Sequence, residues 1–342
     1  MTGCPAFFFE GKLSFLGPLS SLVHSASRHP LFPYVVLLLG IIGVFVVVLG
    51  AVSVSRVVFR VFFRRGKSVS RMSGNGSWAV VTGASDGIGR EFATQLAARH
   101  FNVLLVARTA SKLQAVASEI SSQSAKVQVT THCIDFASAS DADYRSLESA
   151  LGKLKISVLV NNVGTNHDIP TPFASESPAV LDAIVTVNAL SITRITRIVL
   201  PSMILAKRGL ILNVGSFAGL VPTPFLAVYS ATKSFLRTWS IALNAELANS
   251  GVSVEHLSTY FVVSAMSRIK RPSWLVPSAK AYVKSALDNT GIVLNTPYYS
   301  HRIAEYLISL VPSSLLLSYN TSLHKSIRKR ALRKRERDAK KL

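Results

Sequence analysis

From Trp78 onward, short aliphatic runs alternate with longer segments whose apolar residues recur at helical spacing. The aliphatic runs have the length of strands and lie at 78–82, 102–107, 126–134, 157–162, 209–214 and 252–257. The amphipathic segments between them lie near 87–99, 110–122, 178–207 and 226–249. Such alternation is typical of a parallel sheet with helices on both faces. The sequence therefore predicts one α/β domain over residues 77–300, a doubly wound parallel sheet of the Rossmann type.

An uncharged run of 25 residues, Leu31–Ser55, precedes this domain. At a rise of 1.5 Å per residue, a helix of that length crosses a hydrocarbon core of about 30 Å. A secretory signal is the alternative, but its apolar region is shorter, about 7–15 residues, and its positive charge lies upstream. The length and position of this run favour an uncleaved transmembrane helix.

The net charge of +21 lies mainly in two stretches that flank the expected domain. Six basic residues and no acidic one lie at 56–71, and ten basic residues against two acidic ones lie at 325–341. Because the first cluster directly follows the apolar run, it favours a membrane surface over a nucleic-acid partner. Only Lys12 and Arg28 precede the run, so the positive-inside bias places the α/β domain in the cytosol.

These features divide the chain into five expected parts. They are a lumenal segment at 1–30, a transmembrane helix at 31–55, a basic linker at 56–76, the α/β domain at 77–300 and a C-terminal segment at 301–342. Within the last part, the apolar stretch Tyr306–Tyr319 contains Pro312 and is short for a span. Its composition is compatible with an interfacial helix that holds the basic tail near anionic lipid headgroups. It is equally compatible with a solvated, disordered tail.

A glycine-rich turn, TGASDGIG at 82–89, connects the first expected strand to the first expected helix. Glycine lets the backbone turn tightly and lets a phosphate approach the helix N-terminus, where free N–H groups favour anions. The candidate residues for binding the pyrophosphate of a dinucleotide are Gly83, Ser85, Gly87, Ile88 and Gly89.

Residues that follow the next three strands are candidates for the rest of a cofactor site. Arg108 follows the second strand, where a cation suits the 2′-phosphate of NADPH and an acid would suit NADH. A solvated arginine is the alternative there. Asp135 follows the third strand and is a candidate partner of the adenine amino group. Asn162 and Gly164 lie in NNVG after the fourth strand and are candidates for the adenosine side, so the sequence predicts NADPH as the cofactor.

Tyr229 and Lys233 lie four residues apart in YSATK, which places them on one face of a helix. A lysine ammonium near a phenol stabilises the phenolate and lowers the pKa of the tyrosine from about 10. Ser216 lies just beyond the strand at 209–214, at the sheet edge where ligands bind. There Ser216 can donate to a substrate oxygen, Tyr229 can supply a proton, and Asn188 in TVNALS can hold a relay water.

In this order over residues 78–264, these motifs resemble the short-chain dehydrogenase/reductase superfamily. The resemblance implies that Tyr229 is the general acid and Lys233 the group that lowers its pKa. It also implies that Ser216 orients the carbonyl and that Asn188 is the fourth catalytic residue. The implied reaction is hydride transfer from the nicotinamide C4 without a metal.

Further segments are similar to fungal very-long-chain 3-oxoacyl-CoA reductases, and they lie at 86–89, 259–267, 277–283 and 327–332. This likeness implies NADPH-dependent reduction of very-long-chain 3-oxoacyl-CoA in microsomal fatty-acid elongation. It also implies residence in the endoplasmic reticulum membrane, with other elongase components as partners, and it places Val262 and Ser264 at the nicotinamide end of the cofactor. The usual Pro-Gly after the sixth strand is replaced by Thr259-Tyr260-Phe261, so the loop beside the nicotinamide differs.

Two other interpretations stay open on the sequence. A related membrane reductase would use the same catalytic residues on a 17β-hydroxysteroid ketone or on 3-ketosphinganine. A non-catalytic membrane scaffold would keep the reductase fold without turnover. The complete Ser/Tyr/Lys set argues against the scaffold but does not separate the substrates.

Overall fold

The computed structural model describes residues 27, 29–59, 66–72 and 77–340. The chain divides into two compact units, residues 1–63 and 64–342. Most of the expected lumenal segment at 1–30 and parts of the expected basic linker at 56–76 lie outside the described residues.

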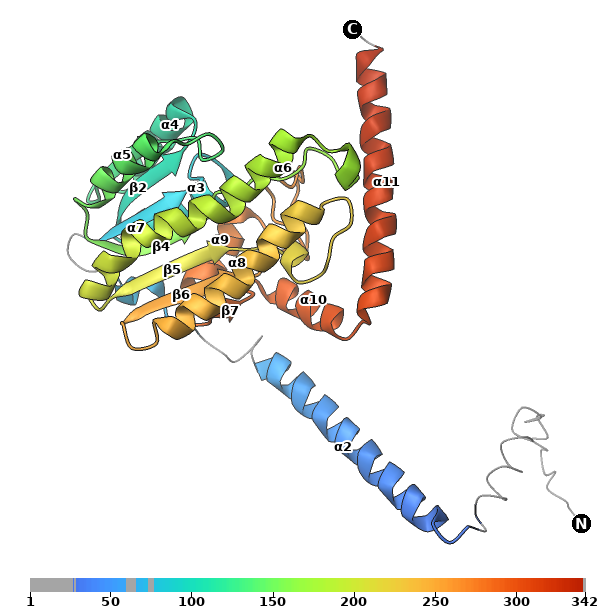
Figure 1. Cartoon of the computed structure of the whole chain (residues 1–342). Helices are drawn as coiled ribbons and strands as arrows, with labels where there is room; N and C mark the ends of the chain where they lie inside the picture. The colour runs from blue at the N-terminus through green and yellow to red at the C-terminus, as the bar shows by residue number, and fades with distance from the viewer. Residues whose placement is uncertain (1–26, 28, 60–65, 73–76, 341–342) are drawn as a thin grey trace, which may run out of the picture. The chain divides into compact units, whose positions relative to one another are not determined.

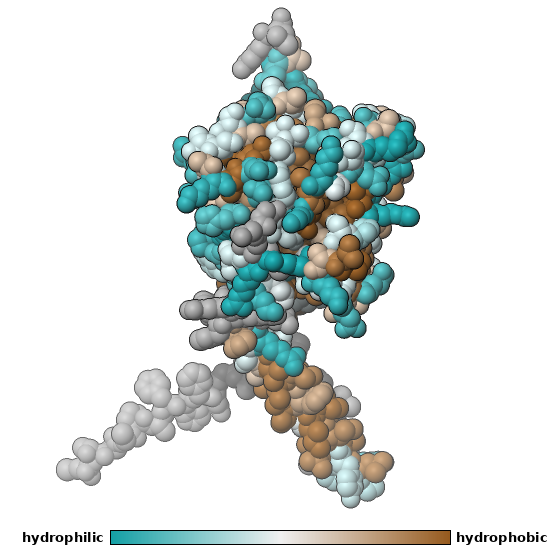
Figure 2. All heavy atoms as spheres, turned by 90° about the vertical axis from the view of Figure 1, so that its left-hand side faces the viewer, coloured by the Kyte–Doolittle hydropathy of each residue, from teal (hydrophilic) through white to brown (hydrophobic). Residues whose placement is uncertain are grey.

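The first unit contains helix α2, Phe32–Val58, which covers the predicted span almost completely. A proline lies in its first turn, where the missing N–H would have had no partner within the helix. None of the residues of α2 is buried, and Figure 2 shows apolar side chains along its visible surface. A helix that is apolar all round and unburied is compatible with a membrane anchor or a signal sequence.

The second unit is built on a seven-stranded parallel sheet with the order β3-β2-β1-β4-β5-β6-β7 (Figure 1). The strands are β1 (Trp78–Thr82), β2 (Asn102–Ala107), β3 (Val129–Cys133), β4 (Ile156–Asn161), β5 (Gly209–Val214), β6 (Val252–Leu257) and β7 (Leu294–Asn295). The chain builds outward from β1 to β3, then returns to pair β4 on the other side of β1. This strand order confirms the predicted doubly wound α/β fold, and its switch point lies between β1 and β4.

Helices cover both faces of the sheet (Figure 1). Those of this unit are α3 (Gly87–Ala97), α4 (Ala110–Gln123), α5 (Asp141–Leu151), α6 (Pro178–Val185), α7 (Ser191–Leu205), α8 (Ala227–Glu246), α9 (Ala279–Asp288), α10 (Tyr299–Ser309) and α11 (Ser313–Ala339). Side chains of α3, α4 and α9 pack with Val81 and the other strand residues on the same face of the sheet into one apolar core. Side chains of α5, α7 and α8 pack with Val80 and the other strand residues on the opposite face into a second apolar core. The two cores follow from the two-residue period of a strand.

The helix predicted at 178–207 changes its helical geometry near its middle. A π-helical segment, Thr186–Leu190, separates α6 from α7. Among the described residues, this helical segment is the second one long and apolar enough to cross a membrane. Ile184 and Ile192 are fully buried in the domain, however, so this segment is a core helix.

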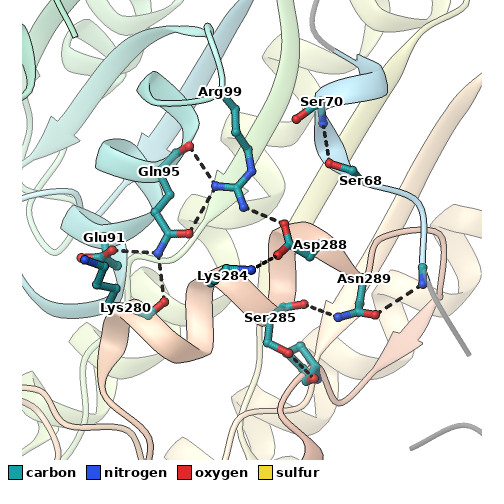
Figure 3. A network of polar contacts seen from close by, with 12 residues as sticks. Ser68, Ser70, Glu91, Gln95, Arg99, Lys280, Lys284, Ser285, Asp288 and Asn289 are labelled. Atoms are coloured by element: carbon teal, nitrogen blue, oxygen red, sulfur yellow. Dashed lines mark hydrogen bonds and ion pairs between the residues drawn. The ribbon is translucent and has the colours of Figure 1, made fainter. Parts of the chain in front are cut away.

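The second unit includes residues that precede the expected boundary at 77. Lys67 and Thr290 exchange two backbone hydrogen bonds, of 2.9 and 3.0 Å, and Val69 is fully buried in the core. The Asn289 side chain accepts a hydrogen bond from the backbone N–H of Gly66 at 3.3 Å (Figure 3). The end of the expected linker is therefore part of the folded domain.

Polar contacts join α3 to α9 beside this segment (Figure 3). Arg99 donates to Asp288 at 2.7 Å, and Lys284 donates to the other oxygen of the same carboxylate at 2.7 Å. Gln95 donates to the Lys280 carbonyl oxygen at 2.9 Å. These contacts fix the C-terminal part of the domain to the helix that follows the glycine-rich turn.

The basic C-terminal segment is helical and packs on the domain. Asn320 on α11 donates to the Pro222 carbonyl oxygen at 3.3 Å, and Arg328 donates to the Pro170 carbonyl oxygen at 2.9 Å. Arg335 forms an ion pair with Asp168. The tail is therefore helical rather than disordered, and one side of α11 has partners on the domain. The apolar stretch at 306–319 is also not one helix, since α10 ends before Pro312 and α11 begins after it.

Candidate active site

The predicted catalytic residues lie in the segments that follow β4 and β5. Ser216 follows β5 after one glycine and caps a short 3₁₀ turn, where its hydroxyl accepts from the N–H of Ala218 at 3.2 Å. Tyr229 and Lys233 lie in the first two turns of α8, which begins eight residues after that turn. Asn188 lies in the π-helical segment before α7. The carboxyl ends of parallel strands are where doubly wound folds bind ligands.

Tyr229 is buried, with 9% of its surface exposed, and it interacts with the Ser216 hydroxyl. Burial raises the pKa of Tyr229 above 10, and the hydrogen bond with Ser216 opposes this shift in part. The net shift in this structure is therefore upward, the reverse of the net lowering predicted from the spacing of Tyr229 and Lys233. The physical reason is that desolvation of the phenolate outweighs the neighbouring groups, and the phenol stays protonated at neutral pH.

Lys233 is 5% exposed, and its ammonium lies 5.8 Å from the centre of the Tyr229 ring. The two side chains thus share one side of α8, as their spacing predicts. The Lys233 Nζ donates to the Val214 carbonyl oxygen at 3.0 Å. Burial lowers the pKa of Lys233 to about 8, so it is largely a cation at pH 7 and largely neutral above pH 9.

Asn188 is completely buried, and its amide joins three parts of the site. Its Oδ1 accepts from the N–H of Thr165 at 2.8 Å, and its Nδ2 donates to the Thr165 carbonyl oxygen at 2.9 Å. The same Nδ2 donates to the Thr232 hydroxyl at 3.2 Å. The π-helical turn orients this amide toward the loop after β4, and π-turns are frequent at functional sites. Asn188 therefore holds that loop against α8.

Gly164 in this loop lies next to Lys233. A Cβ on Gly164 would lie 3.4 Å from the Asn188 Oδ1 and 3.8 Å from the Lys233 Nζ. The loop after β4 thus approaches the lysine through a residue without a side chain.

The glycine-rich turn leaves no room for side chains at two of its glycines. Gly83 has a φ of +65°, which favours glycine. A Cβ on Gly89 would lie 2.2 Å from the Gly83 carbonyl oxygen and 2.4 Å from the Asn162 Nδ2. The first turn of α3 therefore packs directly on the end of β1. Such a turn leaves the N-terminus of α3 open to an anion, as a pyrophosphate requires.

The other candidate residues of this turn lie on its surface and at its base. Ser85 is half-buried, and Ile88 packs against the apolar core. Gly87 has a φ of +55°, and a Cβ on it would lie 3.4 Å from the Cβ of Ser264. Ser264 therefore faces the glycine-rich turn, whereas Val262 is 2% exposed and packs in the core.

Asn162 holds the glycine-rich turn from the neighbouring strand. Its Nδ2 donates to the carbonyl oxygens of Thr82 and Gly83 at 3.0 and 3.2 Å. Its backbone N–H donates to the Thr82 hydroxyl at 3.0 Å. The Asn162 side chain therefore bonds to the turn itself, which fixes the position of the turn beside β4.

Arg108 and Asp135 follow adjacent strands, β2 and β3, at the same edge of the sheet. Both are exposed. The Asp135 carboxylate accepts from the N–H of Ala137 at 3.1 Å, which forms a local turn. Arg108 is thus positioned beyond β2, where a guanidinium can meet a 2′-phosphate.

A buried polar layer between β4, β5, α7 and α8 was not predicted. Asn161 Nδ2 donates to the Asn213 Oδ1 at 2.8 Å and to the Thr196 hydroxyl at 3.0 Å. Asn213 Nδ2 donates to the Ser240 hydroxyl at 2.9 Å. This layer ties β4 and β5 to α7 and to α8, the helix that carries Tyr229 and Lys233. The available signal was an asparagine near the end of each of two otherwise aliphatic strands, SVLVNN and GLILNV.

The comparisons with known proteins agree with this geometry. The short chain dehydrogenase family matches residues 77–273. The chain therefore belongs to the short-chain dehydrogenase/reductase family and is an oxidoreductase.

Within that family, the chain is similar to very-long-chain 3-oxoacyl-CoA reductases. The protein of that name from Aspergillus terreus is 45% identical over 307 residues, which cover 86% of this chain and 87% of the relative. The one from Laccaria bicolor is 45% identical over 87% of this chain and 94% of the relative.

Solved structures of short-chain dehydrogenases share the fold. The enzyme from Sphingobium yanoikuyae in complex with NADPH is 25% identical, with a TM-score of 0.58, and covers 69% of this chain and 96% of its own. A metagenomic short-chain oxidoreductase in complex with NADP is 28% identical, with a TM-score of 0.53, and covers 64% of this chain and 96% of its own. The structural neighbours thus include proteins that bind NADP(H).

Proposed function

We propose that this protein reduces very-long-chain 3-oxoacyl-CoA to 3-hydroxyacyl-CoA with NADPH, at the membrane of the endoplasmic reticulum. The proposed substrate rests on the 45% identity with a reductase of that name over 86% of this chain. The proposed anchor is α2, which is apolar and unburied, with the catalytic domain in the cytosol. Other components of fatty-acid elongation are the proposed partners.

The proposed cofactor site runs along the carboxyl edge of the sheet. The backbone of the glycine-rich turn would hold the pyrophosphate at the N-terminus of α3. Arg108 would bind the 2′-phosphate, Asp135 and the loop at 162–164 would flank the adenosine, and Ser264 would face the turn from the nicotinamide side. When bound, NADPH supplies the hydride that reduces the ketone carbon.

The residues of the chain supply the proton. The hydroxyls of Ser216 and Tyr229 would hold the ketone oxygen, and Tyr229 would donate its proton as negative charge develops there. Because burial raises the pKa of Tyr229, the residue is in the protonated form that a general acid needs. The Lys233 cation would then stabilise the phenolate that remains. Asn188 would position the loop after β4. Because its Nδ2 already donates to two oxygens, Asn188 could hold a relay water only through its Oδ1, which accepts one hydrogen bond in the structure.

Replacing Arg108 with alanine is expected to weaken NADPH binding about 10–100-fold, because a charge-assisted bond to a phosphate is lost. The KM for NADH, which has no 2′-phosphate, should change little. Steady-state kinetics with both cofactors measures the ratio. The matched control is Arg145→Ala, which removes an exposed arginine from α5. An equal loss of affinity for NADPH and NADH would show that Arg108 does not bind the 2′-phosphate.

Replacing Gly89 with alanine is expected to weaken NADPH binding at least about tenfold, because the new Cβ overlaps the Gly83 carbonyl and forces the turn to shift. Fluorescence titration of NADPH measures the affinity, and thermal unfolding without cofactor shows whether the domain stays folded. Gly152→Ala is the control, since its Cβ would meet only the Glu148 carbonyl oxygen, at 3.3 Å. Unchanged affinity in a folded Gly89→Ala protein would contradict the proposed pyrophosphate site.

The substrate assignment is tested by assaying the full-length protein in detergent against a panel of ketones. The panel is a chain-length series of 3-oxoacyl-CoAs, a 17-ketosteroid and 3-ketosphinganine. The expected result is the highest kcat/KM with long 3-oxoacyl-CoAs. A higher kcat/KM with the steroid or the sphingoid ketone would reject the proposed substrate but keep the reductase chemistry.

A further inference from the structure

The turn between α10 and α11 exposes an unusual number of large apolar side chains. We call residues 307–319 the hairpin tip. Its exposed apolar residues are Leu307, Leu310, Val311, Leu315, Leu317 and Tyr319, with 39–65% of their surface accessible. Figure 1 shows that α10 and α11 meet at a corner that lies away from the sheet. A cluster of this kind in water is unfavourable and marks a surface that something covers.

The segment that follows the hairpin tip carries positive charge. Residues 320–335 contain seven basic residues and no acidic one. On α11, Lys325, Lys329, Arg330, Arg333 and Lys334 are all exposed. The one acid of α10, Glu305, is half-buried and bonds to the Thr296 hydroxyl. An apolar tip with a basic flank matches the lipid–water interface of an anionic membrane.

We propose that the hairpin tip inserts into the headgroup region of an anionic bilayer, with the exposed basic side chains of α11 facing the lipid phosphates. A protein partner would match this surface less well, because the apolar residues lie on a protruding corner and the exposed charged residues that follow them at 325–335 are all basic. Residues 59–66 are the whole connection between α2 and Lys67. At full extension such a segment spans about 30 Å, so a bilayer that held α2 would be within reach of the domain.

The hairpin tip is coupled to loops that border the candidate active site. Asn320, one residue beyond the tip, bonds to Pro222 in the loop that follows Ser216. Arg328 bonds to Pro170 and to the Thr171 hydroxyl in the loop that follows Gly164. Membrane contact at the tip therefore lies beside the rim of the site. If the proposed function holds, an acyl chain can stay in lipid while its 3-oxo group enters the site, since keeping methylene groups out of water is favourable.

The test is depth-dependent quenching in the full-length protein. Leu310→Cys is made in a Cys4→Ser, Cys133→Ser background, labelled with an environment-sensitive fluorophore, and reconstituted into phosphatidylcholine–phosphatidylserine vesicles. Lipids brominated near the headgroup are the quencher. Leu310 is 61% exposed, so labelling it does not disturb the core. The matched control is Ser121→Cys, an exposed residue on α4, which lies on the other side of the domain from the corner of α10 and α11 (Figure 1).

We expect brominated lipid to quench the label at 310 at least about threefold more than the label at 121, as insertion about 5–10 Å into the interface requires. Omitting phosphatidylserine should reduce the difference. Equal, weak quenching at both positions would overturn the proposal. So would a label at 310 that is shielded from both brominated lipid and aqueous iodide, since a protein surface would then cover the tip. NADPH oxidation in the same vesicles separates this result from the proposed function, because an active enzyme with an unquenched tip rejects membrane insertion alone.

Discussion

Replacing Tyr229 with phenylalanine is expected to lower kcat for ketone reduction by about 10²–10⁴-fold, the range typical of losing a general acid. The change removes only the hydroxyl, so the buried ring keeps its packing in the first turns of α8. The Kd for NADPH should stay within about twofold, because no contact to the phosphates is lost. Stopped-flow oxidation of NADPH and fluorescence titration measure the two quantities.

Tyr144→Phe is the matched control for this experiment. Tyr144 is 8% exposed, lies on α5 rather than on α8, and packs in the core against Phe136. It should retain a kcat close to that of the natural protein. A Tyr229→Phe protein with unchanged kcat would mean that another group donates the proton. A natural protein without turnover on any ketone of the panel would instead support a scaffold role.

Replacing Lys233 with methionine is expected to lower kcat by about 10²–10³-fold, the cost of removing one charge that stabilises a developing anion. Methionine is close to lysine in length and tolerates burial, so the domain should fold. The bond from Lys233 to the Val214 carbonyl oxygen is lost as well. Circular dichroism and thermal unfolding should therefore accompany the kinetics.

The pH dependence of the natural enzyme gives a second readout for Lys233. Burial lowers the pKa of this lysine to about 8, so its cation is present below pH 8 and is lost above it. Because the cation stabilises the phenolate of Tyr229, kcat/KM for reduction should fall as the pH rises through about 8. The inflection should be absent in Lys233→Met. Lys284→Met, which removes an exposed lysine from α9, should keep the full profile.

Either of two results would contradict this role for Lys233. One is a Lys233→Met enzyme that keeps the inflection near pH 8. The other is a natural enzyme whose kcat/KM rises through pH 8.

The fold was predictable because each central strand is a short aliphatic run that ends in a turn. The limits of 78–82, 102–107, 209–214 and 252–257 match the structure residue for residue. Helix α5 was missed because only Tyr144, Leu147 and Leu151 of its residues are buried, which makes its apolar pattern short. Its start was nevertheless encoded by the capping box of Ser140 and Asp143. The two-residue strand β7 was missed because pairing with β6, not its own composition, creates it.

The arrangement of the candidate site followed from motif order, whereas its electrostatics did not. The spacing of Tyr229 and Lys233 predicted a shared helix face. It did not reveal that Lys233 bonds to a main-chain carbonyl at Val214, because any residue type supplies that oxygen. Nor did it reveal how deeply Tyr229 is buried, which decides the direction of its pKa. The contacts of α11 could not be predicted either, because they depend on tertiary packing. A run of basic residues is equally compatible with a packed helix and with a disordered tail.

In the proposed reaction, a hydride passes to a ketone carbon while Tyr229 supplies the proton. It is tested most directly by mass spectrometry of the product formed from a long 3-oxoacyl-CoA and NADPH that carries deuterium at both positions of the nicotinamide C4. We expect a 3-hydroxyacyl-CoA with one deuterium on C3, formed in a one-to-one ratio with oxidised cofactor and at a greatly reduced rate in Tyr229→Phe. A product without deuterium on C3, or equal rates for the two proteins, would contradict it.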